Sequence, residues 1–95
     1  RPAVFDRSAW LRQSLGDKAL AREVLRLFLS QINRLEKAEF SSLELPFEMH
    51  KLKGSAAVVG AGEIEVITSR WQQFGPRLEA DLRKAFKAFR AASEA

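Results

Sequence analysis

Apolar residues recur at spacings of three and four along most of the chain, a pattern that predicts amphipathic helices. The longest such segment begins after Asp17, a predicted helix N-cap, and runs to about Glu39. Its expected core face consists of Leu20, Val24, Leu27, Phe28, Ile32 and Leu35. We therefore expect one long helix that packs through this face.

A second apolar stripe predicts a central helix that begins close to residues 43–46 and is ended by Gly60 and Gly62. Pro46 fits the first turn of this helix and fits badly at any later position. The residues of the stripe, which we expect to be buried, are Leu45, Met49, Leu52, Ala56 and Val59.

Three shorter periodic segments predict further helices. The first covers about residues 7–15, between a cap at Asp6 and a stop at Gly16. The others cover about residues 63–74 and 77–92, separated by Gly75-Pro76. Their expected apolar contacts are Ala9, Trp10 and Leu15, then Ile64, Ile67, Trp71 and Phe74, then Leu78, Leu82, Ala85, Phe86 and Phe89.

No alternation typical of β-strands competes with these helices. Long amphipathic helices with short connections favour a bundle. We therefore expect an all-α single domain over residues 1–95, an antiparallel four-helix bundle with a short additional N-terminal helix.

The composition fits one small globular domain of 95 residues, 46% of them hydrophobic and 29% charged. Without cysteine the chain has no disulfide, thiolate metal site or cysteine nucleophile. No apolar run reaches the roughly 20 residues that span a bilayer, and no secretory signal is visible. The net charge of +4 raises the question of an anionic partner. From the start at Arg1-Pro2 we expect a fragment of a longer protein.

His50, the only histidine, is expected on the outer side of the central helix. At about 100° per residue it lies about 140° from the middle of the buried stripe, and Gly54 points the same way one turn later. A glycine inside a helix costs about 1 kcal/mol against alanine, which indicates that something outside must come close to His50. Lys51 and Lys53 would give a negative group on the imidazole cationic neighbours.

An exposed neutral imidazole is a competent nucleophile. A metal site would need a second histidine or cysteine, and a hydrolytic triad lacks its partners. The carboxylates expected at helix starts, where they favour the helix dipole, are Glu63, Glu65, Glu79 and Asp81. The sequence shows no pair of carboxylates at a spacing that would indicate a glycosidase or another hydrolase.

Residues 50–61, His-Lys-Leu-Lys-Gly-Ser-Ala-Ala-Val-Val-Gly-Ala, resemble the signature of histidine-containing phosphotransfer (HPt) domains. The family pattern is a histidine, an apolar residue two positions later, then Lys-Gly-Ser and a later Gly-Ala. The helical pattern on both sides extends a looser resemblance over most of the chain. HPt domains are mainly helical bundles that relay phosphate between aspartates of receiver domains through an exposed histidine.

The resemblance implies that His50 is the phospho-acceptor and that Lys53 neutralises phosphoryl oxygens. Gly54 would leave steric access to the histidine. The chain would need no cofactor of its own, because the partner receiver domain carries the aspartate and Mg²⁺.

A docking surface for this partner is expected around the histidine. Phe47, Ala57 and Val58 fall on the outward half of the helix, where a cluster of exposed apolar residues indicates docking. Lys51 is added to this surface, although it matches a variable position of the family. Phe47 has an equal alternative role, which is to fasten the loop 40–46 to the bundle. Ser55 lies beside the buried stripe and is expected only to bond back within its helix.

Two features depart from the family habit. Pro46 shortens the central helix relative to many relatives, and Trp71-Gln72-Gln73-Phe74 stands where relatives often have a Leu-Glu-type pair. Neither touches the phosphorylation signature, but both affect the rim of the docking surface.

The predicted function is therefore that of a phosphorelay intermediate in two-component signalling. The chain has no ATP-binding motif, so we expect no autonomous enzyme activity. We expect a cytoplasmic monomer without nucleic-acid or membrane contact of its own. We expect the chain to be the C-terminal portion of a bacterial hybrid sensor kinase, which can be anchored in the inner membrane. The alternative is a free-standing relay protein.

Two alternatives stay open. One is a non-catalytic helical interaction module in which His50 is inert. The other is a basic nucleic-acid-binding domain, but the interleaved aromatics or recognition helix of such domains are missing. The positive residues Arg83, Lys87 and Arg90, with Lys84 close by, share a face of the last helix that we expect to be solvated.

Overall fold

The computed structural model of the chain describes residues 1–38 and 45–94. Six α-helices and one 3₁₀ helix occupy these ranges: α1 (Arg7–Gln13), α2 (Lys18–Lys37), α3 (Leu45–Val59), α4 (Gly62–Ser69), α5 (Trp71–Phe74), η1 (Gly75–Leu78) and α6 (Glu79–Glu94). The described residues contain no strand, which confirms the predicted all-α class for them. The predicted helix ends at residues 39 and 43–44 lie outside the described residues.

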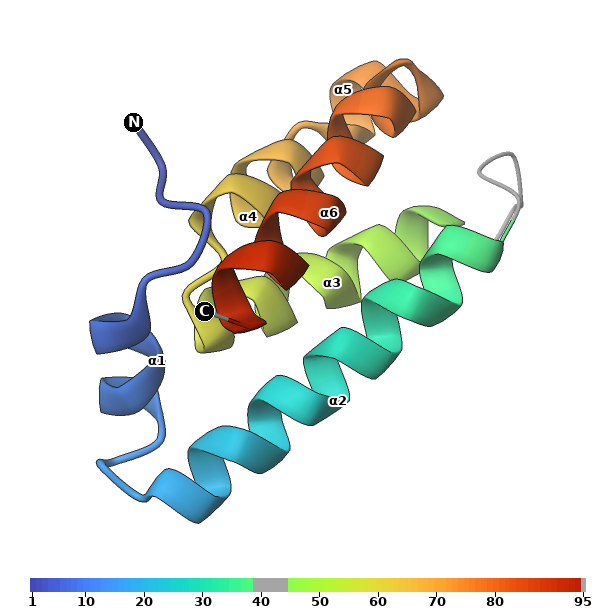
Figure 1. The fold of residues 1–95 in the computed structure, drawn as a ribbon. Helices are drawn as coiled ribbons and strands as arrows, with labels where there is room; N and C mark the ends of the chain where they lie inside the picture. Colours follow the sequence, from blue (N-terminus) through green and yellow to red (C-terminus); the bar gives the residue numbers. More distant parts are fainter. Residues whose placement is uncertain (39–44, 95) are drawn as a thin grey trace.

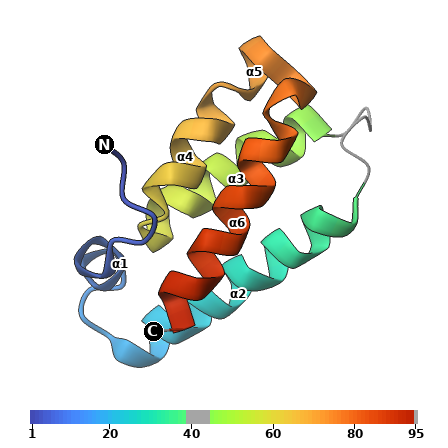
Figure 2. The ribbon, with the colours of Figure 1, turned by 45° about the horizontal axis from the view of Figure 1, so that its top comes forward.

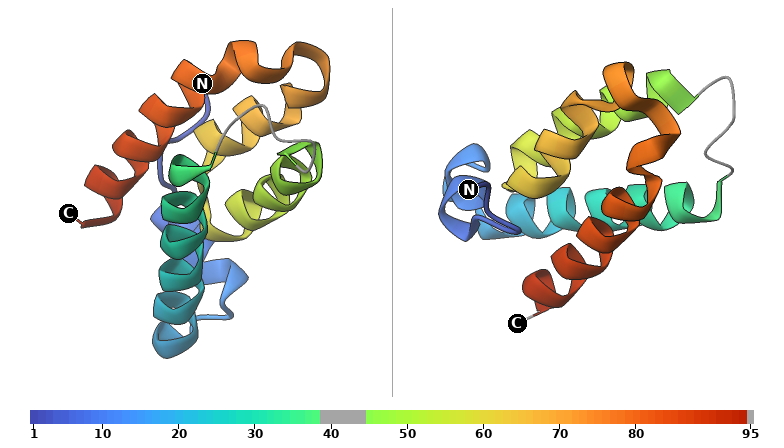
Figure 3. Two further views of the ribbon diagram at one scale, coloured as in Figure 1. Left: turned by 90° about the vertical axis from the view of Figure 1, so that its right-hand side faces the viewer. Right: turned by 90° about the horizontal axis from the view of Figure 1, so that it is seen from above.

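Four helices carry most of the packing, and each contacts two others, in the order α2, α3, α4, α6 and back to α2. Their directions alternate along the chain, and α1 lies against α2 and α3 at one end (Figure 1). The views from other sides show α6 crossing beside α2 and α4, while α5 and η1 form the opposite end (Figures 2 and 3).

The predicted stripe of α3 is buried along its whole length. Leu45, Met49, Leu52, Ala56 and Val59 are each 3% exposed or less. Pro46 is the second residue of the helix, where a proline costs no internal hydrogen bond. Phenylalanines from other segments complete the core: Phe89 packs edge-on against Phe28 and Phe5, with ring centroids 5.0 Å and 5.1 Å apart.

The predicted core face of α2 is partly wrong. Leu20 and Leu27 are 45% and 54% exposed, whereas the buried residues of this helix are Ala21, Phe28, Ile32 and Leu35. Leu20 and Leu27 lie about 80–100° around the helix from Phe28. The apolar stripe of α2 is therefore wider than the face that its neighbours cover.

The predicted helix over residues 63–74 is divided into α4 and α5. The hydroxyl of Thr68 donates to the carbonyl of Ile64 at 2.8 Å, and that of Ser69 donates to the carbonyl of Val66 at 2.6 Å. Side-chain hydroxyls bonded to helix carbonyls slightly destabilise and often bend a helix, and α4 ends at Ser69.

Two residues predicted to make apolar core contacts lie at helix ends and are exposed. Phe74 is 41% exposed because the chain turns directly after it, at Gly75 with φ +58°. Leu15 is 90% exposed because α1 ends at Gln13, two residues earlier than predicted, and Leu15 itself takes φ +56°. Gly16 does follow this helix end, as predicted, but the first left-handed residue is Leu15.

The N-caps were predicted correctly. Asp6 accepts a hydrogen bond from the amide of Ala9 at 3.0 Å, and Asp17 accepts one from the amide of Leu20 at 3.1 Å. Each bond satisfies one of the free amides in the first turn of its helix.

A tight turn at Gly60 ends α3. The amide of Ala61 donates to the carbonyl of Ala56 at 2.9 Å and Gly60 takes φ +75°, which is the Schellman arrangement. Gly62 does not end α3, contrary to the prediction, but begins α4. The N-terminal segment covers this turn, since the Asp6 amide donates to the Gly60 carbonyl at 2.8 Å.

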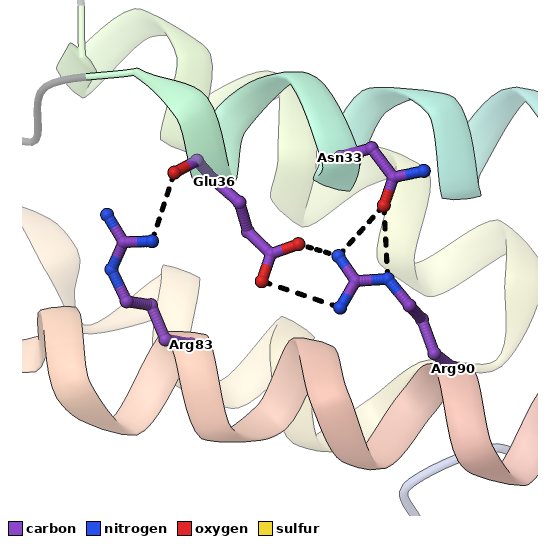
Figure 4. Close-up of polar contacts among 4 residues, drawn as sticks. All are labelled: Asn33, Glu36, Arg83 and Arg90. Atoms are coloured by element: carbon purple, nitrogen blue, oxygen red, sulfur yellow. Dashed lines mark hydrogen bonds and ion pairs between the residues drawn. The ribbon is translucent and has the colours of Figure 1, made fainter.

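The basic face predicted for the last helix is not simply solvated. Arg90 forms an ion pair with Glu36 of α2 and donates to Asn33 through two nitrogens, at 2.8 Å and 3.0 Å (Figure 4). Arg83 donates to the backbone carbonyl of Glu36 at 3.0 Å. Both arginines are half-buried, whereas Lys84 and Lys87 are exposed as predicted. The arginines therefore fasten α6 to the end of α2.

Candidate functional site

His50 lies on the outer side of α3, exposed to solvent. Its neighbours Met49 and Leu52 face the core, are fully buried and fix the orientation of α3. Among residues 1–38 and 45–94, the side chains of His50 and Lys53 form no hydrogen bond or ion pair. The imidazole is thus carried by a rigid element and remains open to an incoming group.

Gly54 leaves open space on the same side of α3. A β-carbon built at this position would meet nothing within 4 Å. No close contact inside the protein accounts for the glycine, whose cost in a helix interior is about 1 kcal/mol relative to alanine. Steric access to His50 therefore stays a prediction for Gly54.

The two lysines near His50 have different surroundings. Lys51 lies 3.7 Å from a carboxylate oxygen of Glu48, and its ammonium group stands 5.2 Å above the ring centroid of Phe47. Glu48 also accepts a hydrogen bond from Arg34 of α2 at 3.4 Å. Lys53 has no such partner among the described residues and is free to meet an anion.

Two hollows flank the ridge on which His50 lies. One, of about 560 Å³, lies between the start of α3 and the segment from the end of α4 to η1, and both His50 and Lys53 line it. The other, of about 650 Å³, is a groove between α2 and α3 that is lined by Lys51 and Gly54. The predicted site residues thus line two different hollows, one on each flank of the outer ridge of α3.

The predicted apolar docking residues are exposed around the histidine. Phe47 is 65% exposed, Val58 is 40% exposed, and Ala57 is exposed as well. Phe47 contacts the ammonium group of Lys51 as described above. Its alternative role concerns the loop 40–46, of which residues 40–44 lie outside the described residues.

Sequence reasoning missed several residues that line the hollows. Leu27, predicted to be in the core, lines the groove together with Val58, Arg34 and Lys51. Gln72 and Ser69 line the hollow beside His50, together with the buried ring of Trp71. Gln72 belongs to the segment Trp71-Gln72-Gln73-Phe74, which departs from the family pattern. This departure indicated that the segment borders the docking surface. Leu27 stands at the spacing of a core residue in its helix, so nothing in the sequence indicated that it lines the groove.

Ser55 behaves as predicted, since its hydroxyl donates to the carbonyl of Lys51 at 3.1 Å and stays within the helix. The carboxylates predicted at helix starts lie in the first turns of α4 and α6: Glu63, Glu65, Glu79 and Asp81. Within the described residues, no three His, Asp or Glu side chains gather as metal ligands do. No helix in these ranges has both the length and the apolar character to cross a bilayer.

Comparison of the chain with protein-family models, with curated proteins and with solved structures yields no match.

Proposed function

We propose that the chain is a phosphotransfer domain in which His50 carries a phosphoryl group between receiver domains. A ring nitrogen of His50 attacks the phosphorus of an aspartyl phosphate, the new P–N bond forms, and the acyl P–O bond breaks to release the aspartate carboxylate. The reverse step on a second receiver returns the phosphoryl group to an aspartate and frees the imidazole. No oxidant, nucleotide or further reactant is needed.

The single observation that carries the proposal is the exposed imidazole of His50 beside the open space at Gly54. In-line attack on phosphorus requires that both groups approach without obstruction. Lys53, which lines the same hollow as His50, supplies positive charge for the phosphoryl oxygens. The resemblance of residues 50–61 to the HPt signature points to the same chemistry.

The proposal also covers the arrangement of the helices and the cellular context of the domain. The alternating helices α2, α3, α4 and α6 are taken as an antiparallel four-helix bundle, with α1 as the short additional helix. The domain acts as a monomer in the cytoplasm and belongs to a bacterial sensor kinase relay. Mg²⁺ and the acidic pocket belong to the receiver domain, so this chain contributes the nucleophile, one cation and an open approach.

The nucleic-acid alternative loses two of its cations, because Arg83 and Arg90 are bonded to α2. The inert-module alternative is separated from phosphotransfer by experiment. Isolated receiver domains are phosphorylated with ³²P-labelled acetyl phosphate, freed of excess reagent and mixed with the protein. We expect label on the protein that is stable to base and labile to acid, as a phosphoramidate is.

His50→Gln removes the nucleophile at an exposed position and should abolish the label without changing the helical circular dichroism. Lys53→Met should slow labelling, whereas Lys84→Met, which removes an exposed lysine of α6, is the matched control and should not. Labelling that persists in His50→Gln, or its absence with every receiver of a broad panel, contradicts the proposal.

A further inference from the structure

The groove between α2 and α3 combines apolar and positive residues beside the proposed site. Leu27 and Val58 are 54% and 40% exposed, and Arg34 and Lys51 line the same groove. Leu27 and Arg34 are separated by about 10 Å along α2, at 1.5 Å per residue. The groove is therefore about two helical turns long, which suits one amphipathic helix.

One carboxylate, that of Glu48, joins the two cations of the groove. One of its oxygens lies 3.4 Å from the Arg34 guanidinium, and the other lies 3.7 Å from the Lys51 ammonium. The Glu48 side chain is only 19% exposed, but those of Arg34 and Lys51 are 62% and 48% exposed. Both cations thus present about half or more of their surface to an approaching partner while Glu48 neutralises part of their charge.

Ion pairs as long as these, at 3.4 Å and 3.7 Å with cations that are largely in water, contribute little to stability, so a carboxylate from outside can compete for one of the cations. A neutral partner helix gains no Coulomb attraction from this group, in which Glu48 offsets one of the two positive charges. An acidic partner helix meets two cations within reach of its own carboxylate. Charge complementarity therefore distinguishes partners by the charge they place in the groove.

We propose that Glu48 is a specificity-determining residue that screens Arg34 and Lys51, and that the groove receives an amphipathic receiver helix with an acidic side chain. This inference rests on the proposed function, because the receiver that occupies the groove is the one that exchanges phosphate with His50. Glu48 belongs to the docking surface and touches no reacting atom. Its effect therefore falls on partner affinity and on KM rather than on kcat.

The test uses the variant Glu48→Gln, which keeps the size of the side chain and removes its charge. Binding of unphosphorylated receiver domains that span a range of net charge is measured by fluorescence anisotropy, and transfer is measured in parallel. For acidic receivers we expect Kd and KM to fall by about threefold or more, with a steeper salt dependence and unchanged kcat. Adding Arg34→Ala to Glu48→Gln should reverse the gain.

The matched control is Glu23→Gln, which removes a carboxylate of α2 outside the groove. Glu23 is also paired, since Arg26 donates to it at 3.0 Å and this bond lowers the pKa of the carboxyl below its usual value. The net charge changes equally in both variants. If Glu48→Gln and Glu23→Gln affect receiver binding equally, the inference is overturned.

The outcomes for the two proposals are distinct. Binding that responds to Glu48→Gln without labelling of His50 refutes the phosphotransfer proposal and retains the groove as a charge-selective docking site. Labelling of His50 without a specific effect of Glu48→Gln refutes the groove inference alone. If no receiver of the panel binds the wild-type protein, both are refuted.

Discussion

Asp6 and Gly60 are fitted to each other at the turn between α3 and α4. The Asp6 amide donates to the Gly60 carbonyl at 2.8 Å, and a β-carbon on Gly60 would overlap the Asp6 carbonyl oxygen. This glycine also has φ +75°, a conformation that disfavours other residues. The N-terminal segment and the end of the histidine-bearing helix therefore form one unit.

Gly60→Ala should destabilise the protein by at least about 2 kcal/mol, because backbone strain and the overlap with Asp6 act together. Urea unfolding followed by circular dichroism measures the change. Gly16→Ala separates the two causes, since Gly16 has φ +74° but nothing within 4 Å of its would-be β-carbon. Its cost should be limited to about 1 kcal/mol. Equal losses for the two variants would contradict the close fit to Asp6.

Substitutions at Gly54 should separate stability from transfer. Gly54→Ala should stabilise the protein by up to about 1 kcal/mol, because alanine is the better helix former and the site is open. Gly54→Leu should slow phosphoryl transfer to His50 at least about tenfold by obstructing the approach. Ala91→Leu, at an exposed position of α6, introduces the same side chain elsewhere and should leave transfer unchanged. Unimpaired transfer in Gly54→Leu would contradict the role of Gly54 in steric access to His50.

Two identical substitutions on α2 should have unequal effects. Leu35 is 2% exposed and Leu27 is 54% exposed. Leu35→Ala should therefore cost about 2–5 kcal/mol of unfolding free energy, and Leu27→Ala less than about 1 kcal/mol. Chemical denaturation measures both. A comparable loss for Leu27→Ala would show that the groove side of α2 is packed after all.

Arg90 and Glu36 join two helices across the molecule, and their side chains are 29% and 26% exposed. A double-mutant cycle with Arg90→Met and Glu36→Gln should yield a coupling free energy of about 1 kcal/mol, at the upper end for a partly exposed pair. Added salt should reduce it. The exposed pair Arg26 and Glu23 should show a smaller coupling free energy in the same experiment. A larger coupling for Arg26 and Glu23 would contradict the role of Arg90 and Glu36 in holding α6 against α2.

The periodicity of α3 was sufficient to predict its buried face, because core packs against one narrow stripe of this helix. It was insufficient for α2, where Leu20 and Leu27 repeat as core residues do but lie beyond the contacts of α3 and α6. Which apolar edge is covered depends on the neighbouring helices, and the sequence of one helix does not specify them. Leu27, which was predicted to be a core residue, instead lines the groove between α2 and α3.

Local chemistry explains the remaining differences. Thr68 and Ser69, whose hydroxyls bond back to helix carbonyls, lie at the end of α4, where apolar spacing alone predicted a continuous helix. At the site, the outward direction of His50 and Gly54 followed from helical geometry. The pairing of Glu48 with both Arg34 and Lys51 did not, because Arg34 comes from another helix.

The two tryptophans lie at opposite ends of the molecule, in different surroundings. The Trp10 indole donates to the carbonyl of Ala21 at 2.8 Å and packs near Phe5 under α1, whereas Trp71 lines the hollow shared with His50. Their emission therefore supplies two built-in optical reporters. With Trp10→Phe, the remaining signal follows events beside the histidine, and with Trp71→Phe it follows melting of the N-terminal end.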